Sequence, residues 1–247
     1  LQTNRYWLAI NQGDDALKKG DVAGAERQYR SAQAIDSRDS WALIGLGDVA
    51  LARKNDAQAE QYWQQALRID GSNTTAIRRL AALYQQQSPA RAMAFINALP
   101  AAQQRSLADT LRSLRSDSLR AEADALAQQG QWHQAVVKYR QAAQDNPNDI
   151  WLSYRLAGAL RSSGEEAQGA QVMDAMVRQH PQEPAALYAW ALWLSSGDQD
   201  GAALAALHRL PETRWDSNMH ELEDRLTQEK VFARATDLRA NGNESAA

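Results

Sequence analysis

The 247-residue chain carries a formal net charge of −3 and 44% hydrophobic residues, a composition typical of a soluble globular protein. This charge gives no electrostatic reason to expect nucleic acid or an anionic membrane surface as partner. The lack of cysteine excludes disulfides, zinc-thiolate sites and thiol nucleophiles. No apolar stretch is long enough to cross a bilayer, so we expect no membrane insertion of this segment. Frequent Ala, Leu, Gln, Arg and Glu, with few Gly and Pro, predict helices nearly throughout.

The sequence repeats with a period of 34 residues. Residues 6–39 align with residues 40–73 without a gap, and the same register returns from Ser116 onward. Small and large residues recur at matched positions. In the first pair of segments these are Gly13, Ala25, Tyr29 and Ala32, then Gly47, Ala59, Trp63 and Ala66; in the later pair they are Ala123, Ala135, Tyr139 and Ala142, then Ala157, Gly169, Met173 and Met176.

These positions resemble the tetratricopeptide repeat, in which Leu-Gly or Leu-Ala marks the first helix and Ala-x3-aromatic-x2-Ala the second. The small residues would let the paired helices approach closely, and the large residue would fill the space between units. Gly20, Gly130 and Gly164 fall where the first helix must turn, a position that favours positive φ. The resemblance implies an all-α fold, a superhelical solenoid of helix pairs.

Two further units, starting near Thr74 and Pro184, are shorter and end in Leu-Pro. After each Leu-Pro we expect an extra, unpaired amphipathic helix, over residues 101–115 and 216–228. Residues 1–115 would then hold three units plus an extra helix, and residues 116–247 three more units, an extra helix and a truncated further unit, all in one continuous solenoid. Gly242 would be the turn glycine of that last unit, so the array is expected to continue. The extra helices should interrupt the regular progression of units.

No nucleophile, nucleotide-binding or zinc-protease motif is present, so we expect a non-enzymatic protein without cofactors. The four histidines, His133, His180, His208 and His220, are scattered, so a metal site would need ligands from distant helices. We therefore predict no metal. Function is expected instead on the groove formed by the first helices of successive units.

In tetratricopeptide repeats this concave groove is lined by fixed positions of the first helix, here filled by aromatic and acidic residues. Chaperone-binding members use Lys and Asn at these positions to clamp a terminal carboxylate, whereas this groove offers aromatic residues and Asp, so a carboxylate clamp is disfavoured. For the tryptophans, packing and ligand contact both remain open, whereas Trp63 and Trp190 are assigned to the core. The candidate binding residues are Trp7, Trp41, Trp151, Tyr154, Tyr188, Asp14, Asp48 and Asp124.

Regular repeats, Leu-Pro-terminated short units and Ala/Gln-rich helices together resemble the periplasmic repeat region of bacterial cellulose export subunits. The motifs that carry the resemblance are the units at residues 13–37, 47–71 and 157–181 and the segments around Leu99-Pro100 and Leu210-Pro211. The resemblance extends over the whole chain.

This resemblance implies a non-catalytic periplasmic scaffold that links an inner-membrane synthase to an outer-membrane pore, with the pore a C-terminal barrel outside this sequence. Its partners would be proteins of the secretion complex and the glucan polymer. Two alternatives remain: a regulatory adaptor that binds a peptide in its groove, and the scaffold of another exopolysaccharide system.

Overall fold

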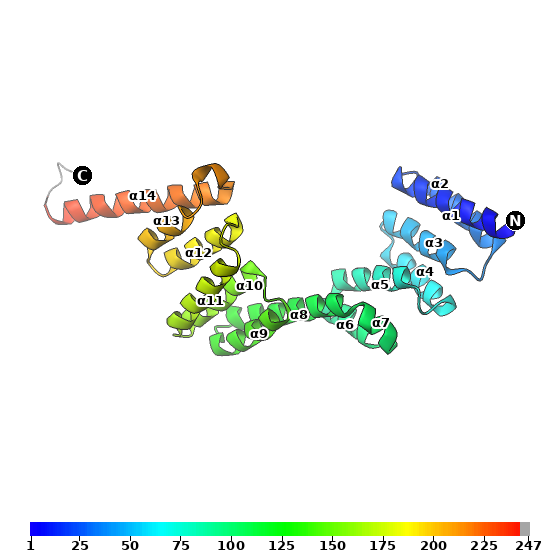
Figure 1. The fold of residues 1–247 in the computed structure, drawn as a ribbon, viewed down its shortest axis with the longest axis horizontal. Helices are drawn as coiled ribbons and strands as arrows, with labels where there is room; N and C mark the ends of the chain where they lie inside the picture. The colour runs from blue at the N-terminus through cyan, green and yellow to red at the C-terminus, as the bar shows by residue number, and fades with distance from the viewer. Residues whose placement is uncertain (243–247) are drawn as a thin grey trace. The chain divides into compact units, whose positions relative to one another are not determined.

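The computed structural model describes residues 1–242, and in this range it shows α-helices, one short 3-10 helix and no strand (Figure 1). The all-α prediction is confirmed. The chain divides into two compact units, residues 1–115 and residues from 116 onward. The boundary between them falls inside one helix, and each unit is described by itself.

The first unit is built from three helix pairs followed by the start of a longer helix. Consecutive helices pack antiparallel because the turns between them are only a few residues long. The pairs are α1 (Gln2–Lys18) with α2 (Val22–Ile35), α3 (Ser40–Ala52) with α4 (Asp56–Ile69), and α5 (Thr74–Gln87) with the shorter α6 (Pro89–Asn97); α7 (Ala101–Ser106) and the first part of α8 (Ala108–Gln128) follow.

The second unit repeats this order. The rest of α8 packs on α9 through Ala123, Ala135 and Tyr139. The other elements are α9 (Trp132–Asp145), α10 (Ile150–Ser162) with α11 (Glu166–Gln179), α12 (Pro184–Ser196) with the short α13 (Asp200–Leu207), the 3-10 helix η1 (Glu212–Arg214) and α14 (Ser217–Ala240).

The predicted small residues are buried as the repeat requires. Ala25, Ala59 and Ala135 have no exposed surface, and the large residue four positions after each is also buried. The first helix lies so close that a Cβ added to Gly47 would come within 2.3 Å of Trp63 Nε1. The repeat register read from the sequence is therefore the packing register of the fold.

In every helix pair except α5–α6, the turn between the two helices uses one residue with positive φ. Gly20 (φ 82°) and Gly130 (φ 74°) confirm the prediction. The same position in two other units holds Lys54 (φ 60°) and Asp198 (φ 61°), where the sequence offers no glycine. A side chain in this left-handed region costs about 1–2 kcal/mol, so the surrounding packing imposes the turn at these two positions.

The two extra helices are present, but their boundaries differ from those expected. α8 runs from Ala108 through the predicted boundary at residue 116 to Gln128, and α14 continues from Ser217 to Ala240 (Figure 1). Neither segment contains Gly or Pro, so nothing in the sequence stops the helix. Both are also packed rather than free: Leu107 and Leu114 complete the core of the first unit, and Met219, Leu222 and Leu226 that of the second.

Candidate functional site

In the first unit, the candidate aromatic residues form a neighbouring pair. Trp7 on α1 and Trp41 on α3 have ring centroids 6.5 Å apart and planes inclined at 57°. Their exposed fractions are 40% and 37%, so each side chain is partly packed against the protein and partly accessible to solvent. Trp41 is the second residue of α3, and the N-cap residue Asp39 accepts hydrogen bonds from the Trp41 backbone N–H (2.9 Å) and from the Tyr6 hydroxyl (2.6 Å).

In the second unit, three candidate aromatics gather. The ring of Trp151 lies 5.6 Å from that of Tyr154 on the same helix and 6.0 Å from that of Tyr188 on α12, both in edge contacts. Tyr154 and Tyr188 are partly buried against the core, whereas Trp151 is 40% exposed. Packing and accessibility therefore coexist in these indoles.

Each of the three candidate aspartates accepts hydrogen bonds from tyrosine or arginine side chains of the same chain. The Tyr29 hydroxyl donates to Asp14 at 2.5 Å, and the equivalent Tyr139 donates to Asp124. Arg155 adds an ion pair to Asp124 at 2.5 Å. Asp48 instead receives Nε and Nη2 of Arg79, at 2.9 and 3.3 Å. These carboxylates therefore tie successive helices together, a role that the sequence interpretation missed.

Burial changes the acidity of this network. It raises the pKa of Asp48 above the usual value of 3.8, although the Arg79 guanidinium acts in the opposite direction. Burial, reinforced by the hydrogen bond to Asp14, raises the pKa of Tyr29. Burial and the bond to Asp124 do the same for Tyr139. Both phenols therefore remain neutral donors at physiological pH.

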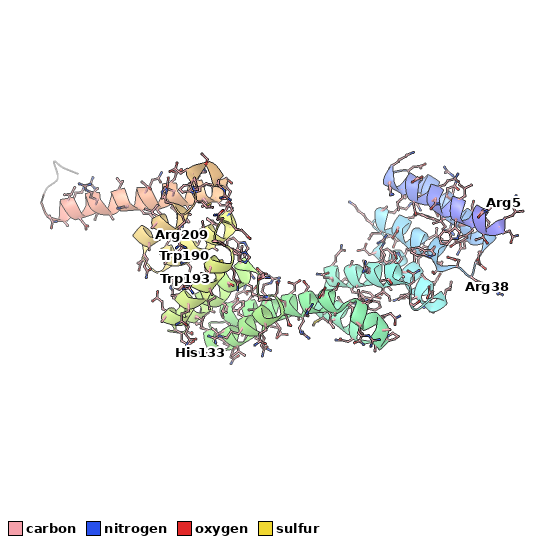
Figure 2. All side chains as sticks on the ribbon, in the orientation of Figure 1. Arg5, Arg38, His133, Trp190, Trp193 and Arg209 are labelled. Atoms are coloured by element: carbon pink, nitrogen blue, oxygen red, sulfur yellow. The ribbon has the colours of Figure 1, made fainter. Side chains whose placement is uncertain are left out.

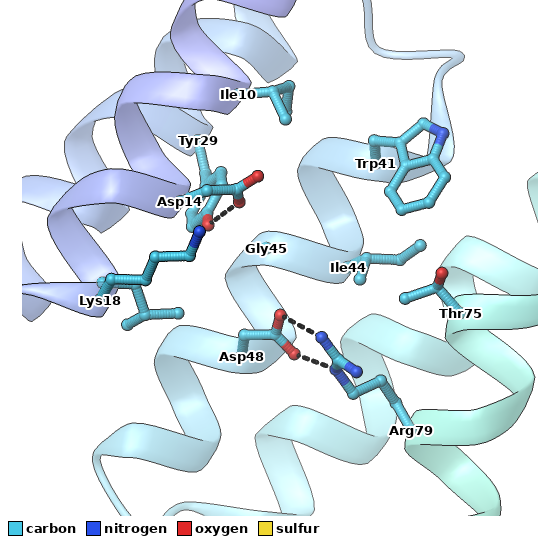
Figure 3. Close-up of a pocket in the computed structure, with 11 residues that line it drawn as sticks. Ile10, Asp14, Lys18, Tyr29, Trp41, Ile44, Gly45, Asp48, Thr75 and Arg79 are labelled. Atoms are coloured by element: carbon cyan, nitrogen blue, oxygen red, sulfur yellow. Dashed lines mark hydrogen bonds and ion pairs between the residues drawn. The ribbon is translucent and has the colours of Figure 1, made fainter.

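A cavity of about 400 Å³ opens beside this network in the first unit (Figure 3). Its wall combines the carboxylates of Asp14 and Asp48 with the indole of Trp41, and α1, α3 and α5 all contribute. The other lining residues are Ile10, Leu17, Lys18, Tyr29, Ile44, Gly45, Thr75 and Arg79. The space is partly open to solvent, and both polar and apolar side chains line it, as in ligand sites.

Two tryptophans of α12 differ from expectation. Trp190, assigned to the core from the sequence, is only partly buried, and the Arg209 guanidinium lies 5.0 Å from its ring centre. Trp193 is the buried one, with the Arg161 guanidinium 3.8 Å from its ring centre. Figure 2 labels both indoles and Arg209. A one-turn periodicity cannot separate positions 190 and 193, because both lie on the inner side of the helix.

The structure also brings a histidine and two glutamates together. His208, Glu212 and Glu223 each place one potential ligand atom within 4.8 Å of the others, and His208 Nε2 lies 2.6 Å from Glu223. They come from the end of α13, from η1 and from α14, which are neighbours rather than the distant helices that the sequence led us to expect. Two of the three side chains are exposed, so the group is a surface ion pair with an acidic neighbour.

Two sequence models, both described as tetratricopeptide repeat, match residues 10–74 and 126–192, together more than half of the chain. The chain belongs to the tetratricopeptide repeat family. A crystal structure of a tetratricopeptide repeat protein from Parabacteroides merdae, 16% identical, covers 98% of this chain and 93% of that one with a TM-score of 0.50. It supports the tetratricopeptide fold and nothing beyond it.

Sequence relatives match along the whole chain. Cellulose synthase operon protein C of Salmonella typhimurium is 48% identical over 99% of this chain, and that of Escherichia coli K12 is 47% identical over 100%. The protein of the same name from Xanthomonas axonopodis is 30% identical over 98%. This confirms the resemblance drawn from the motifs. The tetratricopeptide chain spans about a fifth of the length of the first two relatives, 21% of each.

Across residues 1–242, no helix combines the length and the apolar character needed to span a membrane.

Proposed function

We propose that this chain is part of a non-catalytic periplasmic scaffold for cellulose export, which links an inner-membrane synthase to an outer-membrane pore. The observation that carries the proposal is the 47–48% identity to cellulose synthase operon protein C over essentially the whole chain. Stacked helix pairs of this family present long surfaces for other proteins. The partners are therefore proteins of the synthesis and export complex.

The carboxylates of the chain support a structural rather than a catalytic role. Asp14, Asp48 and Asp124 are committed to tyrosine or arginine donors that join neighbouring helices. A general acid or base needs a proton position facing a substrate. Carboxylates that staple one helix to the next suit a spacer.

Weak glucan contact forms part of the proposal. The exposed faces of Trp7, Trp41 and Trp151 suit the flat C–H face of a sugar ring. Covering about 100 Å² of one indole at ~25 cal/mol per Å² gives roughly 2.5 kcal/mol before ordering costs. A single contact is therefore weak, and retention of a polymer would depend on several contacts at once.

The scaffold role is tested in the full-length protein by removing residues 1–247 in frame. We expect cellulose at the cell surface to be lost while glucan synthesis by inner-membrane vesicles continues. The control deletes the same segment and restores it as a separate insertion of the unchanged sequence. Normal surface cellulose without the segment would contradict the scaffold proposal.

Glucan contact is tested separately by titrating the chain with soluble cello-oligosaccharides. Trp41→Ala and Trp151→Ala should each weaken binding, and Trp190→Ala, outside the candidate set, serves as control. Thermal melts of each variant report whether the fold is intact. If the unchanged chain binds nothing at millimolar ligand, polymer contact is rejected and protein contacts remain.

The runner-up function is a regulatory adaptor that binds a peptide in its groove. The cavity beside Asp14 and Trp41 favours it, because such a recess accepts a single side chain. A full-length product that lacks an export signal and an outer-membrane pore would favour the adaptor over the scaffold.

A further inference from the structure

The position 31 residues after each of the three candidate aspartates is an arginine in two cases and a glycine in the third. Arg79 stands 31 residues after Asp48, and Arg155 stands 31 residues after Asp124; in both cases the arginine pairs with the aspartate of the preceding unit. The residue 31 positions after Asp14 is Gly45. The same helix-joining ion pair is thus complete at two places and lacks its cation at the third.

The Tyr29 ring fills the place beside Gly45 where an arginine side chain would begin. The ring leans against Gly45 so closely that an added Cβ would come within 2.4 Å of it. Beside the two lies the cavity of about 400 Å³ (Figure 3). The cavity therefore borders the position that carries the arginine in the two complete pairs.

The two carboxylates that line the cavity differ in their partners. Asp48 is engaged by both guanidinium contacts of Arg79, whereas Asp14 accepts a hydrogen bond from the neutral Tyr29 hydroxyl alone. Lys18 also lines the space, one turn after Asp14. Within residues 1–242, however, no side chain forms an ion pair with Asp14. Asp14, an exposed carboxylate in the cavity wall, is therefore the one of the three aspartates without a guanidinium partner, although Lys18 and Arg79 line the same space.

We propose that this cavity binds an arginine side chain from a segment of a partner protein. Its guanidinium would take the place at Asp14 that Arg155 holds at Asp124, and its stem would lie along Ile44 and Trp41. The chain's own two pairs are the template for this ligand, because they show the same carboxylate position bound by a guanidinium. A neutral sugar could donate only uncharged hydrogen bonds to Asp14.

The proposal is tested by NMR titration of ¹⁵N-labelled chain with N-acetyl-arginine methylamide. The matched control ligand is N-acetyl-citrulline methylamide, which has the same shape without the charge. The arginine analogue should shift the amide signals of Asp14, Gly45 and Asp48, with millimolar affinity, and the citrulline analogue should not. Asp14→Asn should weaken binding at least about tenfold, since it removes a charge-assisted hydrogen bond. Asp15→Asn, the exposed neighbour, makes the same change in net charge and should leave binding unchanged.

A second variant creates the site elsewhere. Arg155→Ala empties the position at Asp124, so it should add a second set of arginine-dependent shifts, at Asp124 and Tyr139. This gain keeps the test decisive if Asp14→Asn fails to fold. Equal binding of both analogues, unchanged binding by Asp14→Asn, or equal binding of N-acetyl-lysine methylamide would overturn the assignment to arginine. None of these readouts involves glucan, so the result is independent of the proposed function.

Discussion

The carboxylate of Asp48 accepts two hydrogen bonds from the guanidinium of Arg79, at 2.9 Å from Nε and 3.3 Å from Nη2. The carboxylate is mostly buried, with a side-chain exposed fraction of 17%, while the arginine is 43% exposed. The pair joins the first helices of two successive units, α3 and α5. The ion pair therefore connects two repeat units and is not confined to the surface of one helix.

Arg79→Gln should lower the free energy of unfolding by about 2 kcal/mol, because a mostly buried carboxylate loses its charged partner. The matched control is Arg78→Gln on the same helix, whose side chain is exposed and should change stability by less than about 0.5 kcal/mol. Urea unfolding at pH 7 measures both. Equal effects of the two variants would show that the ion pair contributes nothing.

Acidification should change the contributions of Asp48 and Glu26 to the free energy of unfolding in opposite directions. Burial raises the pKa of Asp48, so between that raised value and 3.8 the folded state binds more protons than the unfolded state, and this group stabilises the fold as pH falls. Asp48→Asn removes this gain, so its stability relative to the unchanged chain should decline on acidification through that window. Asn is neutral at every pH and still offers Arg79 an oxygen.

Glu26 provides the opposite case. The hydrogen bond from Arg53 lowers its pKa below 4.5, so its contribution is complete above pH 4.5 and is lost as pH falls through the folded-state value. The deficit of Glu26→Gln should therefore shrink on acidification. Unfolding curves between pH 3 and 7 compare the two variants; parallel trends would contradict the assigned directions.

Ala59→Asp should lower the free energy of unfolding by roughly 3 kcal/mol, since position 59 has no exposed surface and a carboxylate there would lack a partner. Ala57→Asp lies in the first turn of the same helix, is exposed, and should be close to neutral. Circular dichroism melts of the two variants give the comparison. A small effect at position 59 would mean that the repeat register is displaced.

Asp117→Pro tests whether α8 is one helix. The position lies in the interior of α8, where proline costs about 3 kcal/mol. If a new helix began at residue 116, as the repeat alone indicates, proline would sit in its first turn and be tolerated. Ala108→Pro, at the first residue of α8, is the control that should be tolerated. Similar melting temperatures for the two variants would favour two separate helices.

The sequence predicted the units and their buried positions because each unit repeats the same packing problem. Ala59 and Trp63 fill the core at offsets visible without coordinates. The repeat predicted the turn at Gly130, but not that the extra helix and the first helix of the next unit would join into one continuous helix, α8. The positive φ of Lys54 was not predictable either, because packing imposes it and a lysine does not indicate such a turn.

Part of the arrangement at the candidate site follows from the repeat positions. Trp7 lies beside Trp41, as repeated positions on adjacent first helices should. The arginine partners of the aspartates were missed because they stand one unit away: Arg155 is 31 residues from Asp124. The constant spacing of Asp48 to Arg79 was a visible signal, but its meaning depends on how far apart successive helices lie, which only the structure shows.

The fixed spacing between partners has a consequence for how such an array can change in length. Loss of the unit at residues 40–73 would leave the remaining units in register, because the segment is one full period. Arg79 would then stand 31 positions after Asp14, the spacing that pairs Arg155 with Asp124. A single in-frame deletion would thus supply the missing cation and close the cavity. Gain or loss of units would therefore alter ligand selection as well as reach, and natural variation in unit number would also be variation in recognition.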